Sequence, residues 1–493
     1  MFKLNHHIIL VLIAIFNLLA CTKNVNDYYT ENKKPSIFPD YTDVVIPPNI
    51  APLNFTVLEK GSRYHIEISS ENGGRIIIEQ SSPKICIPLR KWHKLLMENK
   101  SKTLNIDVYV KKESWVKYTS IRDSIVSENL DNHLVYRLIN PVIVLWYKMG
   151  IYQRNLENFE EKAIYENKSE KDGCVNCHMF CKNNPDKMSL HFRQAYSGTV
   201  ILNGDSLKKI NTKTEKTIAA AAYPSWHPDG DIIAYSANQI NQDFVSDYTK
   251  TSNVWDQVSD IVLYDVKRNL IFSDPKISTT SRENLPTWSP DGKWMYFISA
   301  PEVSEALNNQ INCQYDLLRI AFDPNTYTFG EVDTILTSRQ TGLSITFPLI
   351  SPDGQYIVFA MTDIGYFTIY HRISDLYIMD LQTFEYRKLD INSTSNESYH
   401  SWSSNGRWLC FTSKRTDNIH SLPYFSYFDL NGNTHKPFVM PQEDPEFYNT
   451  FMKNYNRPEL VTGEVKVNAI EMRDIVYGDP QSVIYEDNPS SLK

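Results

Sequence analysis

Five consecutive residues carry the clearest chemistry of the sequence, Cys174-Val175-Asn176-Cys177-His178. In a C-x-x-C-H sequence, the two thiols can each form a thioether with one vinyl group of a porphyrin, and the imidazole that follows can bind the iron. From the cysteine and histidine content of this chain, a chance match is expected roughly 0.002 times. The sequence therefore predicts one covalent c-type haem, held by Cys174, Cys177 and His178.

A haem iron has a second axial position, and candidates for it lie downstream. Met188 and His191 are three residues apart, so on a helix they would share a face, and either could be the distal ligand. A thioether ligand would raise the reduction potential, whereas a second imidazole would leave it lower. Arg193 could pair with a haem propionate. His227 is a further candidate, as a distal ligand or as a hydrogen-bonding partner of one.

Other chemistry is possible at the same cysteines. Cys174, Cys177 and Cys181, with His178 or His191, could bind zinc, because mixed thiolate and imidazole sets suit tetrahedral Zn²⁺. Two of the cysteines could instead form a disulfide. A thioredoxin-like pair would need a βαβ setting that the sequence lacks. The histidine directly after the second cysteine favours haem.

The first 21 residues predict export. Lys3 precedes an apolar run at residues 8–16 that is too short to span a membrane. The following Leu18-Leu19-Ala20-Cys21 resembles a bacterial lipobox, which implies cleavage before Cys21 and a membrane anchor through lipid on its thiol; the alternative is an ordinary signal peptide. Polar residues 22–45 are expected to be a tether. They begin without an acidic cluster, which favours the periplasmic face of the outer membrane.

Composition limits the partners and the fold class. The 493 residues include 50 Lys plus Arg and 58 Asp plus Glu, for a net charge of −8. This acidic balance argues against nucleic acid as a partner, because phosphate binding needs a dense basic face. Aromatic residues make up 12% of the chain, which favours β-structure.

Four similar segments in the C-terminal half predict the fold that positions the candidate haem residues. Each has an aromatic or apolar start, a turn that contains Asp-Gly or Asn-Gly, and an alternating strand, as expected of tight hairpins. The segments are YPSWHPDGDIIAYSA (223–237), LPTWSPDGKWMYFIS (285–299), FPLISPDGQYIVFAM (347–361) and YHSWSSNGRWLCFTS (399–413). They resemble the TolB-like, WD40-like β-propeller repeat, which implies a propeller over residues 196–470, typically with six blades, and leaves 471–493 as a tail.

The N-terminal half is also expected to be β-structure. Short alternating runs between residues 46 and 139 predict a β-sandwich-like domain. Residues 140–195 are expected to be a connector that carries the haem segment. The fold class predicted for the whole chain is therefore mainly β.

Further segments extend the resemblance to nearly the whole chain. They are IPPNIAPLNF at 46–55, LVYRLINP at 134–141 and GIYQRNLENF at 150–159. With the lipobox, CVNCH and the repeats, they are similar to a family of Bacteroidetes TolB-like propeller lipoproteins, some of which are labelled as cytochrome c or its biogenesis. The resemblance implies the same architecture, haem attachment and a place in the bacterial cell envelope.

Two functions follow from these predictions. The first is electron transfer or redox sensing by an envelope-anchored lipoprotein with one haem and a redox partner. The alternative is a non-catalytic scaffold that binds envelope proteins and carries a structural haem or zinc. The sequence contains neither G-x-S-x-G nor H-E-x-x-H, so a hydrolase is not predicted.

Overall fold

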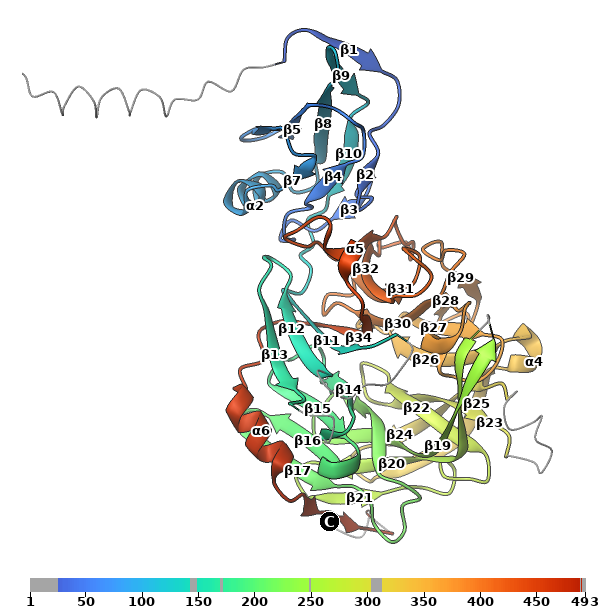
Figure 1. The fold of residues 1–493 in the computed structure, drawn as a ribbon. Coiled ribbons are helices and arrows are strands. Elements are labelled where there is room, and N and C mark those ends of the chain that lie inside the picture. The colour runs from blue at the N-terminus through green and yellow to red at the C-terminus, as the bar shows by residue number, and fades with distance from the viewer. Residues whose placement is uncertain are drawn as a thin grey trace, which may run out of the picture.

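A computed structural model describes residues 25–141, 149–168, 172–247, 250–302, 313–487 and 489 of the chain. The predicted signal segment and the lipidation site Cys21 lie outside these residues. Figure 1 shows a small N-terminal domain, drawn in blue, above a much larger ring of sheets. Within the described residues, no helix is long and apolar enough to cross a membrane.

The N-terminal domain combines two sheets with one helix. Its seven-stranded sheet has the path β1-β9-β8-β10-β3, and β5 joins β6 to β8; a second sheet has the order β2-β4-β7. The strands are β1 (Tyr28–Glu31), β2 (Ile37–Phe38), β3 (Val45–Ile46), β4 (Phe55–Val57), β5 (Arg63–Ser69), β6 (Ile76–Gln80), β7 (Lys84–Ile85), β8 (Thr103–Lys111), β9 (Trp115–Tyr118) and β10 (Ile121–Ile125). Helix α2 (Leu89–Glu98) covers the core with Trp92, Leu95 and Leu96.

The described part of the expected tether belongs to this domain. Strand β1 pairs in parallel with β9, and β3 pairs in parallel with β10. Tyr41 and Val44, between these strands, are buried in the domain core. Residues 28–46 are therefore folded, because their apolar side chains complete a sheet that the polar composition of the segment did not reveal.

Among the described residues, six four-stranded sheets form the blades of a β-propeller, as predicted, and two of them gain a fifth strand from the C-terminus. Starting from the innermost strand, the blades are blade 1, β34 (Asn454–Val461), β11 (His133–Ile139), β12 (Gly150–Asn155) and β13 (Glu161–Glu166); blade 2, β14 (Val175–Phe180), β15 (Lys187–Phe192), β16 (Gly198–Asn203) and β17 (Ser206–Asn211); blade 3, β18 (Ala221–Trp226), β19 (Ile232–Asp247), β20 (Lys250–Asp265) and β21 (Leu270–Phe272); blade 4, β22 (Arg282–Trp288), β23 (Trp294–Ala300), β24 (Asp316–Asp323) and β25 (Thr328–Leu336); blade 5, β26 (Ser344–Ile350), β27 (Tyr356–Thr362), β28 (Asp375–Asp380) and β29 (Tyr386–Lys388); and blade 6, β30 (Glu397–Trp402), β31 (Trp408–Ser413), β32 (Leu422–Tyr427) and β33 (Phe438–Val439).

The propeller begins earlier in the sequence than expected. Strand β11 pairs antiparallel with β34, so blade 1 joins residues from both ends of the propeller and closes the ring. Strand β11 is therefore not part of a sandwich, and the expected connector at 140–195 supplies β12 to β15. Closure of this kind satisfies the backbone groups of a strand that would otherwise lie at an open sheet edge.

The expected C-terminal tail is attached to the blades. Helix α6 (Ala469–Tyr477) buries Met472 and Val476, and the side chain of Asn468 caps its N-terminus. Strands β35 (Gln481–Ser482) and β36 (Ile484–Tyr485) then extend blades 2 and 3. The remaining short elements are η2 (Gln194–Tyr196), α4 (Ser338–Thr341), η3 (Thr368–Tyr370) and α5 (Phe447–Thr450).

The two parts of the chain meet at blade 6. Asp131 accepts hydrogen bonds from the backbone N–H and the hydroxyl of Ser404, at 2.7 and 2.6 Å. The indole of Trp408 donates to the carbonyl of Glu128 at 3.3 Å. One apolar core runs from the N-terminal domain into blades 5 and 6. The N-terminal domain is therefore packed on the propeller as well as linked to it.

Candidate functional site: two cavities on the propeller axis

Each innermost strand contains a bulge at the same position. At this position a residue other than glycine has a positive φ, between 36° and 53°, and the ladder shifts register next to it. The six residues are Cys177, Tyr223, Leu285, Phe347, Tyr399 and Arg457. Because a left-handed conformation is costly for a residue with a Cβ, its recurrence in all six blades marks a feature of the repeat rather than an accident.

These six residues form a central ring around the propeller axis. Tyr223, Leu285, Phe347, Tyr399 and Arg457 enclose a space of only about 20 Å³. The rings of Phe347 and Tyr399 are in edge contact, with centroids 4.7 Å apart. The central ring therefore nearly fills the axis and separates a funnel on one side from a lower cavity on the other.

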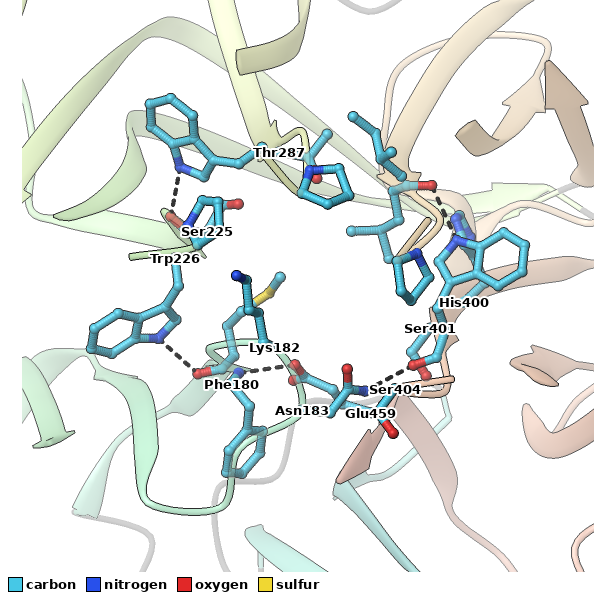
Figure 2. Close-up of a pocket in the computed structure, with 18 of the residues that line it drawn as sticks. Phe180, Lys182, Asn183, Ser225, Trp226, Thr287, His400, Ser401, Ser404 and Glu459 are labelled. Atoms are coloured by element: carbon cyan, nitrogen blue, oxygen red, sulfur yellow. Dashed lines mark hydrogen bonds between the residues drawn. The ribbon is translucent and has the colours of Figure 1, made fainter. Parts of the chain in front are cut away.

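The funnel has a volume of about 380 Å³ and is lined by residues that follow the central ring on the innermost strands. This is in the range of pockets that hold small ligands. Figure 2 shows Ser225, Thr287, Ser401 and Glu459, from four different blades, around an open centre. The funnel combines these polar groups with proline and tryptophan surfaces.

Tryptophans tie neighbouring blades together around the funnel. The indole N–H of Trp226 donates to the carbonyl of Met179, that of Trp288 to Ser225, and that of Trp402 to Leu349, at 3.2, 3.2 and 3.3 Å. In each case the acceptor lies on the innermost strand of the preceding blade. The repeated tryptophan therefore fixes the position of the polar funnel residues.

The charges in the funnel are unequal. Lys182 is exposed, and neither its ammonium nor the Arg457 guanidinium forms an ion pair among the described residues. Glu459 is the one acidic side chain among the described residues of the lining, and burial raises its pKa to about 7. Burial also lowers the pKa of His400 to about 4, so this imidazole is neutral near pH 7. The funnel thus offers unpaired positive charge.

Of the predicted haem-attachment residues, Cys177 and His178 lie on β14 and Cys174 immediately precedes it, and the three lie in different surroundings. Cys177 belongs to the central ring, and Cys174 lines the lower cavity. His178 is 1% exposed and packs toward blade 1, with Nε2 3.9 Å from Glu459 Oε2, which is too far for a hydrogen bond. Burial, with Arg457 and Arg137 nearby, lowers the pKa of His178 to about 3. This imidazole lines neither cavity.

The predicted distal ligands do not share a face. Met188 and His191 lie on strand β15, not on a helix, and an odd separation places them on opposite sides of a strand. Met188 is fully buried in the apolar core near β14. His191 contacts Thr199, with Nδ1 3.2 Å from Oγ1, and burial lowers its pKa to about 3. Arg193 follows this strand and lines the lower cavity.

His227 is bonded within the blade 3–4 contact. Its Nε2 is 3.0 Å from the carbonyl of Gly292, and its Nδ1 is 2.9 Å from Asp229. The ring also makes a T-shaped contact with Trp288, at 4.8 Å between centroids. His227 therefore holds two turns together and is not directed toward the predicted haem residues.

In this fold the residues predicted for haem do not fit a porphyrin. The lower cavity reaches about 210 Å³, which is below the size of pockets for drug-sized ligands, and its lining includes Cys174 and Arg193 but not His178. Nor do three or more His, Cys, Asp or Glu side chains gather as metal ligands within the described ranges. The alternative zinc set, which includes Cys181, is thus not assembled.

Two funnel residues on β34 were not among those predicted from the sequence. Arg457 and Glu459 flank Pro458 in a segment that lacks the Asp-Gly turn of the other repeats. A signal was present, because Pro458 matches Pro224, Pro286 and Pro348, which also follow the central-ring residue.

No known family model matches the chain. A segment of 153 residues is 32% identical to a Bacillus subtilis (strain 168) protein described as "uncharacterized peptidase YuxL"; it covers 31% of this chain and 19% of that protein. The chain therefore spans about a fifth of the length of this relative.

Among solved structures, TolB from Acinetobacter baumannii is similar over 73% of this chain and 79% of its own, with 13% identity and a TM-score of 0.44. A protein described as putative TolB from Agrobacterium tumefaciens is similar over 66% of this chain and 98% of its own, with 13% identity and a TM-score of 0.36.

Proposed function

We propose that this protein is a non-catalytic binding protein of the cell envelope, and that its funnel binds an extended, acidic segment of a partner protein. The observation that carries the proposal is the unpaired positive charge of Arg457 and Lys182 in a funnel of about 380 Å³. Hydroxyl groups around the funnel can form hydrogen bonds with a peptide backbone, and a carboxylate of the partner would accept hydrogen bonds from the guanidinium of Arg457.

The contacts in the funnel favour binding over catalysis. Among the described residues, no hydrogen bond joins a funnel hydroxyl to His400, whose Nε2 instead contacts the carbonyl of Val358 at 2.9 Å. A hydroxyl nucleophile needs an adjacent base to become reactive. The tryptophans are held by hydrogen bonds to backbone carbonyls, so they offer a rigid wall to a ligand.

A displayed library of short random peptides tests this function. We expect the mature chain to enrich sequences with acidic residues, and we expect Arg457→Gln to weaken a selected peptide by about tenfold or more, the loss of a charge-assisted hydrogen bond. Arg122→Gln, on the exposed face of the N-terminal domain, is the matched control. Equal binding by the Arg457 variant, or selection without acidic residues, would contradict the proposal.

The place of the protein in the cell is part of the same proposal and rests on Leu18-Leu19-Ala20-Cys21. Lipid on Cys21 would hold the propeller at the periplasmic face of the outer membrane, where envelope proteins are the available partners. We expect Cys21→Ala to move the protein from the membrane fraction to the soluble fraction. A variant that stays in the membrane fraction after a salt wash would argue against the anchor.

A covalent haem for electron transfer or redox sensing is the second proposal, carried by the CVNCH sequence. In the fold described here, Cys174, Cys177 and His178 lie around no common cavity, so haem attachment would require β14 to leave its place in blade 2. The test is haem staining of the denatured protein after expression with cytochrome c maturation machinery, beside a Cys174→Ala/Cys177→Ala variant. Stain that is absent from the variant would support haem, and absence from both would end this proposal.

A further inference from the structure

The lower cavity and the funnel share no lining residue, and only the funnel is lined chiefly by residues that follow the central ring on the innermost strands. The volume of the lower cavity is about 210 Å³. Asn176 and Cys174 reach it from blade 2, and Ile240 and Val254 reach it from the long hairpin of blade 3. With Tyr223 of the central ring in its wall, this cavity is separate from the funnel and can have a ligand of its own.

Two arginines give the lower cavity an uncompensated positive charge. Arg137 and Arg193 both line it, and among the residues that the structure describes no aspartate or glutamate does. Neither guanidinium forms an ion pair in the part of the chain that the structure describes. Arginine stays protonated inside proteins, and a buried charge without a partner is costly. The cavity therefore favours an anion.

The position of the Arg137 side chain is fixed by contacts with its neighbours. Arg137 is 8% exposed, and its Nη1 donates to the carbonyl of Val175 at 3.1 Å and lies 3.8 Å from the sulfur of Cys174. Its buried Nε has no hydrogen-bond partner among the described residues. The Nη1 contacts therefore hold this side chain in place while Nε stays without a partner, and the planar donors of an arginine suit a carboxylate.

The other walls specify the rest of the ligand. The side-chain oxygen of Asn176 is buried without a hydrogen-bond partner in the described ranges, so it can accept a bond. Phe367 and Tyr370 lie nearly parallel, with centroids 5.5 Å apart and 13° between their planes. With Ile139 and Met149 they make an apolar wall beside the charged one. Exposed Gln194 also lines the cavity and gives it an edge in contact with solvent.

We propose that the lower cavity binds a small organic carboxylate whose apolar body packs against Phe367 and Tyr370 while its carboxylate is held by Arg137 and Arg193. A bare inorganic anion would leave the apolar wall uncovered, and a neutral molecule would leave both charges unpaired. The inference is independent of the funnel, because none of these four residues lines the funnel.

Calorimetric titration of the mature chain tests the proposal with three probes: benzoate, its neutral counterpart benzamide, and inorganic phosphate. We expect one benzoate to bind for each chain, and benzamide and phosphate to bind at least tenfold more weakly. Arg193→Gln should weaken benzoate at least tenfold while the thermal unfolding temperature without ligand stays the same or rises, because an unpaired charge has been removed. Arg122→Gln should bind benzoate like the parent chain.

Each other result would overturn the proposal. Failure of benzoate to bind the folded chain, or equal binding of benzamide, would show that the arginines do not select a carboxylate with an apolar body. Phosphate binding alone would show that only charge matters. Unchanged benzoate binding by Arg193→Gln, in a chain that unfolds like the parent, would place any binding elsewhere. The titration does not involve acidic peptides, so its failure is distinct from failure of the funnel proposal.

Discussion

The stability of the Glu459→Gln variant, measured relative to that of the parent chain, should be greater at neutral pH than at acidic pH. The carboxylate accepts a hydrogen bond from the backbone N–H of Phe180 at 2.9 Å, and its second oxygen has no hydrogen-bond partner among the described residues. Burial raises the pKa of Glu459 to about 7 from an ordinary value of 4.5, against the opposing effects of Arg457 and the Phe180 N–H. Glutamine keeps the acceptor and removes the titration.

The sign follows from proton binding. Between pH 4.5 and 7 the folded chain holds a proton on Glu459 that the unfolded chain releases, so the free energy of unfolding falls as pH rises. The gap of about 2.5 between the two pKa values corresponds to about 3 kcal/mol at 1.36 kcal/mol for each pH unit. The stability of Glu459→Gln, minus that of the parent, should therefore grow by about 3 kcal/mol between pH 4.5 and 7 and stay constant above.

Urea unfolding of both proteins at several pH values measures this difference. Asp256 and Asp123, whose pKa values burial raises to about 7 and about 8, contribute equally to both proteins and cancel. Glu464→Gln is the control, because Lys162 holds the pKa of that exposed carboxylate below its ordinary value and the pH trend should be small and opposite. Parallel stability curves for the parent chain and Glu459→Gln would refute the reasoning.

Three other substitutions test the architecture. Trp288→Phe removes the indole donor to Ser225 and should lower the free energy of unfolding by about 1 kcal/mol in urea titrations, and an unchanged midpoint would show that the contact adds nothing. Asp131→Ala removes both acceptors of Ser404 and should cost about 2 kcal/mol, with faster hydrogen exchange at the blade 6 hairpin; unchanged exchange would show that this contact does not hold the domains together. His178→Pro places in blade 2 the residue that follows the central ring in four other blades, so the chain should still fold, with a circular dichroism spectrum like that of the parent; loss of the β signal would contradict the equivalence of the blades.

The four repeats with Asp-Gly or Asn-Gly turns predicted blades 3 to 6 because their chemistry is local. A tight hairpin needs particular residues at particular positions, and these are visible in any short segment. Blade 1 could not be recognised in this way, because β11 and β34 are paired across more than three hundred residues of sequence. Apolar patterning in 133–139 shows a strand, but nothing in it names the partner.

The candidate site shows a different limit. On a helix the three-residue spacing would put Met188 and His191 on one face, whereas on strand β15 it puts them on opposite faces. Conversely, Arg137 and Arg193 are far apart in sequence, and only the blade 1–blade 2 contact brings them to one cavity. Sequence can identify residues able to hold an anion, but the absence of a neighbouring carboxylate is a property of the folded chain.

The CVNCH segment joins these two lessons, because it belongs to two patterns at once. As a motif, Cys177-His178 follows Cys174 with the spacing of a haem attachment site. As a repeat, the same pair occupies the place of Tyr223-Pro224 and Tyr399-His400, with the same positive φ at its first residue. In blade 2, Cys177 belongs to the central ring, so a covalent haem would require β14 to leave this place. The described fold follows the repeat here: the carbonyl of Met179 accepts from the Trp226 indole and the N–H of Phe180 donates to Glu459, and these two bonds tie β14 to blades 3 and 1.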